Sequence, residues 1–192
     1  DRPRLLVLAS TYPRWAGDPE PAFVHELARR LVGSFDVTVL CPHAKGAALR
    51  EVMDGVQVVR YRYGPAGAEV LVNDGGIMAN LRRSRWRWLL VPGFLASQGI
   101  ATWRMVRSLR PDVVHAHWIL PQGLVARMAG AGLGRKAPLL LTSHGVDLFS
   151  LRGWFPMWLK RRVVRAASAL TVVSSAMLPE ILQLGAQAAQ CE

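Results

Sequence analysis

The chain has 192 residues, of which 51% are hydrophobic and 19% charged, and it carries a formal net charge of +11 at pH 7. This length suits one domain with a sizeable core, and the composition excludes a disordered chain. Cys41 and Cys191 are the only cysteines and lie far apart, which favours a reducing compartment over a disulfide framework. The charge predicts attraction to an anionic membrane surface, nucleic acid or a phosphorylated ligand.

Predicted strands and helices alternate along the chain. Strands are expected at residues 4–10, 35–41, 56–63, 112–115, 138–142 and 169–173. Helices are expected at residues 22–32, 77–90, 93–109, 121–131, 154–167 and 176–184, with a break near Pro92. This alternation predicts an α/β fold with a doubly wound, mainly parallel Rossmann-like sheet and helices on both faces. The apolar run at residues 5–9 is too short for a signal peptide, so we expect a cytoplasmic protein.

The loop at residues 12–21 joins the first predicted strand to the first predicted helix. A dinucleotide-binding fold has a Gly-rich phosphate loop here, but the G-x-G-x-x-G spacing is absent and three prolines make the loop stiff. A nicotinamide dehydrogenase is therefore disfavoured, although the helix start still offers N–H donors to an anion. In the helix itself, Phe23, Leu27 and Leu31 recur at helical spacing.

Two predicted strands end in histidines. One runs into His144, Gly145 and Asp147, and the other ends at His115 and His117. Because ligands bind beyond the carboxyl ends of parallel strands, His144, Asp147 and His117 are candidate site residues, whereas His115 is expected in the core. The alternative for His144 is a loop histidine bonded to backbone. No third ligand accompanies His115 and His117, so we expect no metal site.

The positive charge gathers in clusters. One cluster consists of Arg82, Arg83, Arg85, Trp86, Arg87 and Trp88, and a second contains Lys160, Arg161, Arg162 and Arg165. Indole rings among arginines are typical of a membrane interface, so we expect the first cluster to contact an anionic membrane. Nucleic acid and plain solvated helix faces are the alternatives, but no nucleic-acid-binding motif is present. No stretch reaches the roughly 20 apolar residues of a membrane span.

Several segments together resemble a family 4-type glycosyltransferase. They are the loop with Tyr12-Pro13-Arg14 and Gly17-Asp18, the helix start AFVHELA (22–28), the strand FDVTVLCP (35–42), DVVHAHW (112–118) with LPQG (120–123), TSHGVD (142–147) and LTVVSS (170–175). They occur in the order expected for that family and extend over nearly the whole chain.

The resemblance implies a retaining enzyme of two-domain GT-B architecture that takes a sugar from a nucleotide donor. Residues 1–192 would be its single Rossmann-like, acceptor-side N-terminal domain, without the C-terminal domain that holds the nucleotide. We therefore expect the isolated chain to be inactive. The nucleotide sugar is a co-substrate and no other cofactor is implied. With the basic cluster, we expect a lipid-linked or polysaccharide acceptor at the inner membrane face.

The resemblance also assigns residue roles. His144 matches a histidine near the transferred sugar, and Asp147 its partner, whose carboxylate is expected to fix the tautomer of the ring. Gly17 lies in the loop that approaches the donor phosphate or the acceptor. Asp18 follows it where many relatives have a second glycine, and it would repel a diphosphate or receive an acceptor hydroxyl. The predicted substrate-binding set also contains His117, Trp118, Gln122 and Gly145. The alternative functions are a basic nucleic-acid-binding module and a non-catalytic α/β interaction domain.

Overall fold

The computed structural model describes residues 2–65, 67–131 and 137–191. Within them, one sheet has the strand order β3-β4-β2-β1-β5-β6-β7. The strands are β1 (Arg4–Leu8), β2 (Asp36–Pro42), β3 (Arg50–Met53), β4 (Val56–Tyr61), β5 (Val113–His117), β6 (Leu139–Ser143) and β7 (Ala169–Val172). All pair in parallel except β3, which is antiparallel to β4. The predicted mainly parallel α/β sheet is confirmed.

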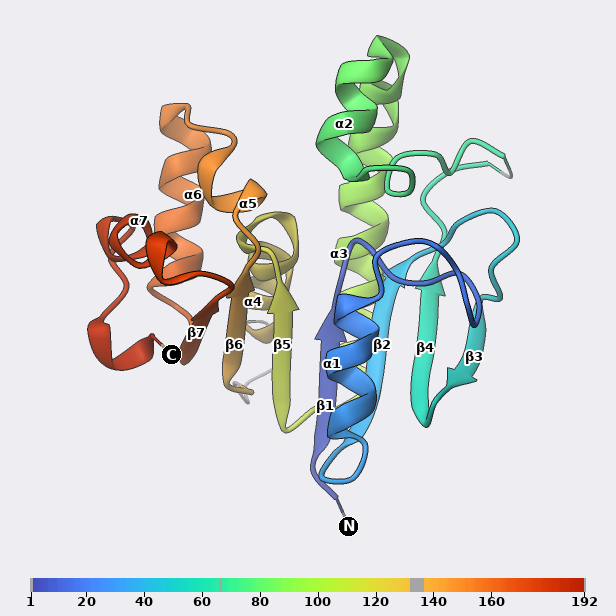
Figure 1. Ribbon diagram of the computed structural model, residues 1–192, viewed down its shortest axis with the longest axis horizontal. Coiled ribbons are helices and arrows are strands. Elements are labelled where there is room, and N and C mark those ends of the chain that lie inside the picture. The colour runs from blue at the N-terminus through green and yellow to red at the C-terminus, as the bar shows by residue number, and fades with distance from the viewer. Residues whose placement is uncertain (1, 66, 132–136, 192) are drawn as a thin grey trace.

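Helices cover both faces of the sheet, as predicted. They are α1 (Phe23–Leu31), α2 (Gly76–Arg83), α3 (Leu90–Leu109), α4 (Leu124–Ala131), α5 (Val146–Phe149), α6 (Trp154–Val164) and α7 (Leu178–Gln183). Short helical turns are η1 (Arg85–Leu89), η2 (Ile119–Gly123), η3 (Ser175–Met177) and η4 (Ala188–Gln190). In Figure 1, α1 lies in front of the sheet, and α3 and α4 lie behind it. None of the described helices is long and apolar enough to cross a membrane.

The two faces have separate apolar cores because successive strand residues point to opposite sides. In β1, Leu6 and Leu8 pack with residues of α3, α4 and α6. The intervening Leu5 and Val7 pack with Val24 and other residues of the α1 side. The first strand is therefore buried from both sides, which explains its unbroken apolar run.

The structure shows which side of α1 is buried against the sheet. Phe23 and Leu27 are 43% and 40% exposed, while Val24, His25 and Ala28 are buried. The helix is turned so that small side chains contact the sheet, and Phe23 lies over the edge instead. His25 is enclosed because its Nδ1 bonds the Tyr12 hydroxyl at 2.7 Å and its Nε2 contacts Asp54 at 2.9 Å.

Two further elements differ from the prediction. The expected break near Pro92 is absent, because Pro92 occupies the first turn of α3, where an N–H has no helical partner. The strand β3 was not predicted. It joins β4 through Asp54 and Gly55, which both have positive φ (48° and 82°), as a tight hairpin turn requires.

Candidate functional site

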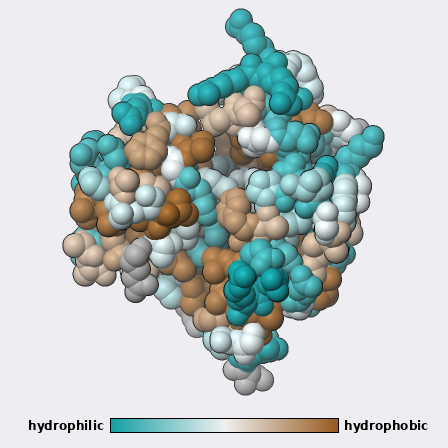
Figure 2. Space-filling model, in the orientation of Figure 1, coloured by the Kyte–Doolittle hydropathy of each residue, from teal (hydrophilic) through white to brown (hydrophobic). Residues whose placement is uncertain are grey.

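The candidate site lies at the carboxyl edge of the sheet between β1 and β5. The chain leaves β1 toward β2 on one side and leaves β5 toward β6 on the other, so the strand order reverses there. Open α/β sheets bind ligands in the crevice at such a reversal. The first turn of α1 begins at this edge, and no side chain caps it. In the space-filling view, a recess divides the upper part of the molecule (Figure 2).

Aromatic and imidazole rings gather at this reversal. The His144 ring lies 4.8 Å, centroid to centroid, from both the Phe23 and the Trp118 rings. Phe23 and Trp118 are 6.0 Å apart, and His117 Nδ1 is 2.9 Å from His144 Nε2. The structure thus brings together the predicted residues His117, Trp118 and His144. Phe23 was not among the predicted site residues. It lies at the start of the helix that follows the first predicted strand, and a helix start is a usual ligand position.

Three histidines form a neutral row on the α1 face of the sheet. His115 and His117 have ring centroids 4.2 Å apart, and His115 Nε2 is 2.7 Å from Thr142 Oγ1, which confirms His115 as a bonded core residue. Burial lowers the pKa of His115 to about 4, and it lowers the pKa of His117 and of His144. Each ring is therefore uncharged at pH 7 and offers one donor and one acceptor. Among the described residues, His117 Nε2 has no partner.

Asp147 binds backbone and a hydroxyl rather than the His144 ring. Its Oδ2 accepts a hydrogen bond from the Ile119 backbone N–H at 2.7 Å. Its Oδ1 accepts from Ser143 Oγ at 3.0 Å and from the His144 backbone N–H at 3.1 Å. The Asp147 carboxylate was expected to fix the tautomer of the His144 ring. The ring nitrogen instead contacts His117. Asp147 ties the end of β6 to the turn η2 and so holds the two halves of the site together.

Gly145 and Lys160 fix the conformation of the loop that carries His144. Gly145 has φ of +94°, a conformation that disfavours a side chain, and its carbonyl oxygen accepts the N–H groups of Leu148 and Phe149. Lys160 is completely buried, and its Nζ donates to the Leu148 carbonyl at 2.9 Å and to the Ser150 carbonyl. This cation on α6 therefore fixes the end of α5.

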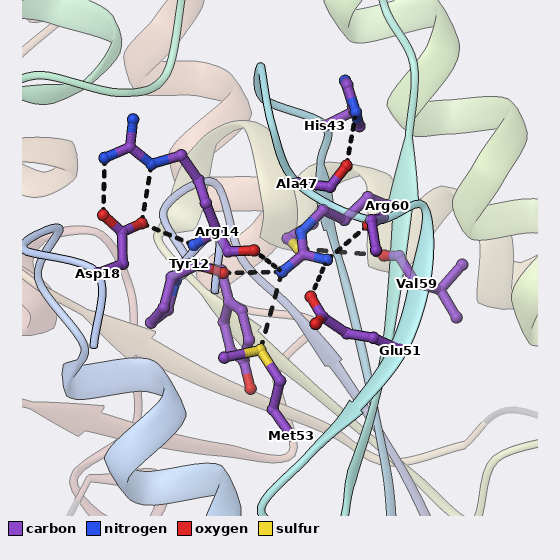
Figure 3. Close-up of polar contacts among 12 residues, drawn as sticks. Tyr12, Arg14, Asp18, His43, Ala47, Glu51, Met53, Val59 and Arg60 are labelled. Carbon is purple, nitrogen blue, oxygen red and sulfur yellow. Dashed lines mark hydrogen bonds and ion pairs between the residues drawn. The ribbon is translucent and has the colours of Figure 1, made fainter. Parts of the chain in front are cut away.

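Asp18 is bound by Arg14, as Figure 3 shows. The guanidinium Nε and Nη2 lie 2.9 and 2.6 Å from the carboxylate oxygens, and the Arg14 backbone N–H donates at 2.7 Å. These donors hold the pKa of Asp18 at about 2. The pairing offsets the repulsion that was expected toward a diphosphate, and it leaves the carboxylate poorly placed for an acceptor hydroxyl. Gly17, with φ of +79°, has open space where a Cβ would point.

Arg60 fixes the same loop from β4 (Figure 3). Its buried guanidinium donates to the carbonyl oxygens of Pro13 at 2.8 Å and Ala48 at 2.6 Å, and it pairs with Glu51 at 2.5 Å. The loop after β1 is therefore attached to the β3–β4 hairpin. Sequence reasoning missed Arg60, because its contact with Pro13 spans 47 residues and leaves no local pattern.

Trp118 and Gln122 lie where the chain turns out of β5. Trp118 has φ of +76°, which is strained for a residue with a bulky side chain. Gln122, in η2, is completely buried, and among the described residues neither of its amide atoms has a partner. The structure thus places the Trp118 ring in the cluster, whereas Gln122 lies beneath the surface.

The first basic cluster is largely exposed. Arg82 and Arg83 at the end of α2, and Arg85, Trp86 and Trp88 in η1, face solvent. Arg87 is an exception, because it is half-buried and its Nη1 donates to Asn80 Oδ1. The described part of the chain contains no group of three or more His, Cys, Asp or Glu side chains that could hold a metal ion.

The sheet order and the helices on both faces define a Rossmann-like α/β fold like that of a GT-B N-terminal domain. Residues 21–192 match the family model of the glycosyl transferase 4-like domain, and the chain belongs to this family. The prediction made from the sequence segments is thereby confirmed.

Solved structures support the fold. HepE from Anabaena, solved with UDP-glucose, has a TM-score of 0.59 and 15% identity, and the match covers all of this chain and 43% of that one. The match to a UDP-N-acetylglucosamine 2-epimerase from Rickettsia bellii (TM-score 0.54, 9% identity) covers all of this chain and 44% of the epimerase. The match to a trehalose-phosphate synthase from Burkholderia vietnamiensis (TM-score 0.53, 14% identity) covers 94% of this chain and 42% of the synthase.

The chain thus spans less than half the length of these proteins. Because an epimerase shares the fold, these structures identify an architecture and not a reaction. A comparison with curated proteins gave no match.

Proposed function

We propose that this chain is the acceptor-side domain of a retaining glycosyltransferase that moves a sugar from a nucleotide-sugar donor to a lipid-linked or polysaccharide acceptor. The observation that carries the proposal is the cluster of Phe23, Trp118, His117 and His144 at the strand-order reversal. Family membership supports glycosyl transfer as the chemistry. The cluster supplies what a sugar needs, namely flat apolar surfaces for its ring and neutral hydrogen-bonding groups for its hydroxyls.

His144 is the proposed catalytic residue of the cluster. Its neutral ring shares a proton with His117 through the Nε2–Nδ1 contact, which leaves the Nδ1 of His144 to bond a sugar hydroxyl. Asp147, expected to act beside it, is proposed to position the loop through the His144 backbone. Front-face attack within an ion pair, which the family resemblance implies, requires no side-chain nucleophile on this domain.

The remaining predicted residues have supporting roles in this proposal. Gly17 leaves open space beside the loop after β1, where a donor phosphate or the acceptor could approach closely. Asp18, neutralised by Arg14, shapes that loop. Gly145 lets the chain turn beside His144, and Gln122 supports the wall behind Trp118.

We propose a UDP-sugar as the donor because HepE was solved with UDP-glucose and the trehalose-phosphate synthase is described as UDP-forming. The nucleotide would be held mainly by a second domain, since the chain covers only 43% of HepE. The 192 residues alone are therefore expected to be inactive. The exposed Arg82, Arg83, Arg85, Trp86 and Trp88, with Arg87 behind them, support contact with an anionic membrane at its cytoplasmic face.

The experiment is a transfer assay with the natural full-length protein, a panel of UDP-sugars and lipid-linked or oligosaccharide acceptors. We expect a glycosylated product with retained anomeric configuration for at least one donor, and none from the 192-residue chain. Turnover by the isolated chain would contradict the proposal that a second domain holds the nucleotide. A full-length protein that binds oligonucleotides with steep salt dependence and transfers no sugar would favour the nucleic-acid alternative.

A further inference from the structure

The positive charge of the chain lies in two acid-free segments. Residues 75–111 contain seven arginines, residues 148–179 contain four arginines and one lysine, and neither segment has an Asp or a Glu. These twelve cations exceed the net charge of +11, so the rest of the chain is close to neutral. Within the described residues, none of the twelve forms an ion pair, whereas Arg2, Arg4, Arg14, Arg29, Arg30, Arg60 and Arg62 do.

The second segment builds an aromatic and basic stripe on α6. Its members are Trp154, Phe155, Trp158, Arg161, Arg162 and Arg165, and all are exposed. Their spacing puts them along one side of the helix, opposite the buried Val163 and Val164. Trp154 is 84% exposed, an unusual position for an indole. We call this set the α6 stripe.

The three rings of the stripe form a continuous apolar ridge. Trp154 meets Phe155 edge-on at 5.6 Å, and Phe155 stacks on Trp158 at 6.0 Å with 20° between the ring planes. The Arg162 guanidinium lies 4.6 Å from the Trp158 ring centre. Phe155 and Trp158 therefore each have one ring face covered by a neighbour, while the Trp154 ring is open to solvent.

The α6 stripe and the first basic cluster stand on the same side of the molecule. α3, α4 and α6 pack in one layer against one face of the sheet, with α4 between the other two. In Figure 1, α6 and the α2–α3 region both rise above the carboxyl ends of the strands. Figure 2 shows the recess between these raised parts. Along the chain, Trp154 follows His144 by ten residues, and the short helix α5 lies between them.

We propose that the α6 stripe is a second membrane-docking surface, which inserts its rings into the interface of a bilayer that contains anionic phospholipid. Rings at the headgroup level with arginines beside them match the chemistry of that interface. Unpaired arginines and the absence of acidic side chains provide the charge complementarity. A second copy of the chain is disfavoured as the occupant, because like charges on the two partners would repel. The inference rests on the proposed membrane-bound acceptor, which two docking points on either side of the recess would present to His144.

The test measures binding of the natural full-length protein to sedimented vesicles. One set of vesicles consists of neutral phosphatidylcholine, and the other also contains about 30% phosphatidylserine, which gives a strong negative surface potential. We expect binding to the acidic vesicles that weakens at least tenfold in the triple variant Trp154→Ala, Phe155→Ala, Trp158→Ala. Arg161→Gln with Arg162→Gln should weaken it by about fivefold per arginine. The control is Trp103→Ala, which should bind like wild type. Trp103 is an indole on α3 about 20 Å along the helix from Leu90, and its exposure (43%) is close to that of Trp158 (45%).

Several outcomes would overturn the inference. They are equal binding to both vesicle types, unchanged binding by the triple variant, an equal effect of Trp103→Ala, ring-dependent oligonucleotide binding, or ring-dependent self-association. Transfer to a water-soluble acceptor separates the two proposals, because the triple variant should keep that activity. A wild-type protein that transfers sugar to the soluble acceptor but does not dock overturns only the docking surface. A wild-type protein that docks through the stripe but transfers no sugar overturns only the proposed function.

Discussion

Replacing Asp147 with alanine tests whether this carboxylate holds the site together. The change removes the acceptor for the Ile119 N–H, the His144 N–H and the Ser143 hydroxyl. A hydrogen bond to a charged group contributes about 1.5–3 kcal/mol, and a buried donor left unsatisfied costs about 1–3 kcal/mol. Ser143 can rotate its hydroxyl to another acceptor, so the full sum is not reached. We expect Asp147→Ala to lower the free energy of unfolding by about 3–5 kcal/mol.

The assay is equilibrium urea unfolding, followed by tryptophan fluorescence, with Ser143→Ala as the matched control. That control removes one donor and leaves the other two paired, so it should cost about 1 kcal/mol. If Asp147→Ala unfolds within about 1 kcal/mol of wild type, the carboxylate does not hold β6 to η2 and the reasoning fails.

Three further predictions concern stability. Arg60→Met should cost about 2–4 kcal/mol in urea unfolding, because the carbonyls of Pro13 and Ala48 and the Glu51 carboxylate lose their donor; a loss below about 1 kcal/mol would count against the Arg60 attachment of the loop. Since the folded-state pKa of Asp18 is about 2, below its ordinary 3.8, about 1–2 kcal/mol of stability present above pH 4 should disappear as the pH falls to 2. Asp18→Asn should lack that loss, and an identical acid profile would refute its origin. Since the folded-state pKa of His115 is about 4, below 6.5, stability should also fall as the pH drops from 6.5 to 4. His115→Gln should reduce that slope, and an unchanged slope would show that His115 does not cause it.

Local pattern was enough to predict every described strand except β3, and part of the site. Strand ends are recognisable from apolar runs, and parallel strands end at one edge, so the order of residues alone places His117, Trp118 and His144 together. Their mutual bonding could not be predicted. Which atom of His144 faces His117, and which faces Asp147, depends on the turn geometry after β5 and β6.

The predictions that failed depended on tertiary packing. Periodicity predicted the first helix but not which of its residues are buried. The structure buries Val24 and Ala28 and leaves Phe23 and Leu27 exposed. Pro92 was expected to break a helix because its position within the first turn was unknown. The α6 stripe was recognised only as a basic cluster, since exposure of Trp154 cannot be read from a helical pattern alone.

The central claim is that His144 contacts the sugar during transfer. The most direct measurement is kcat/KM of the natural full-length protein with and without His144→Ala, accompanied by urea unfolding of both proteins. Loss of one positioned hydrogen-bonding group in the transition state predicts a fall of about 10²–10³-fold. The free energy of unfolding should change by less than about 1 kcal/mol, because the His144 ring is only partly buried. A variant that folds normally and retains wild-type kcat/KM would contradict the account.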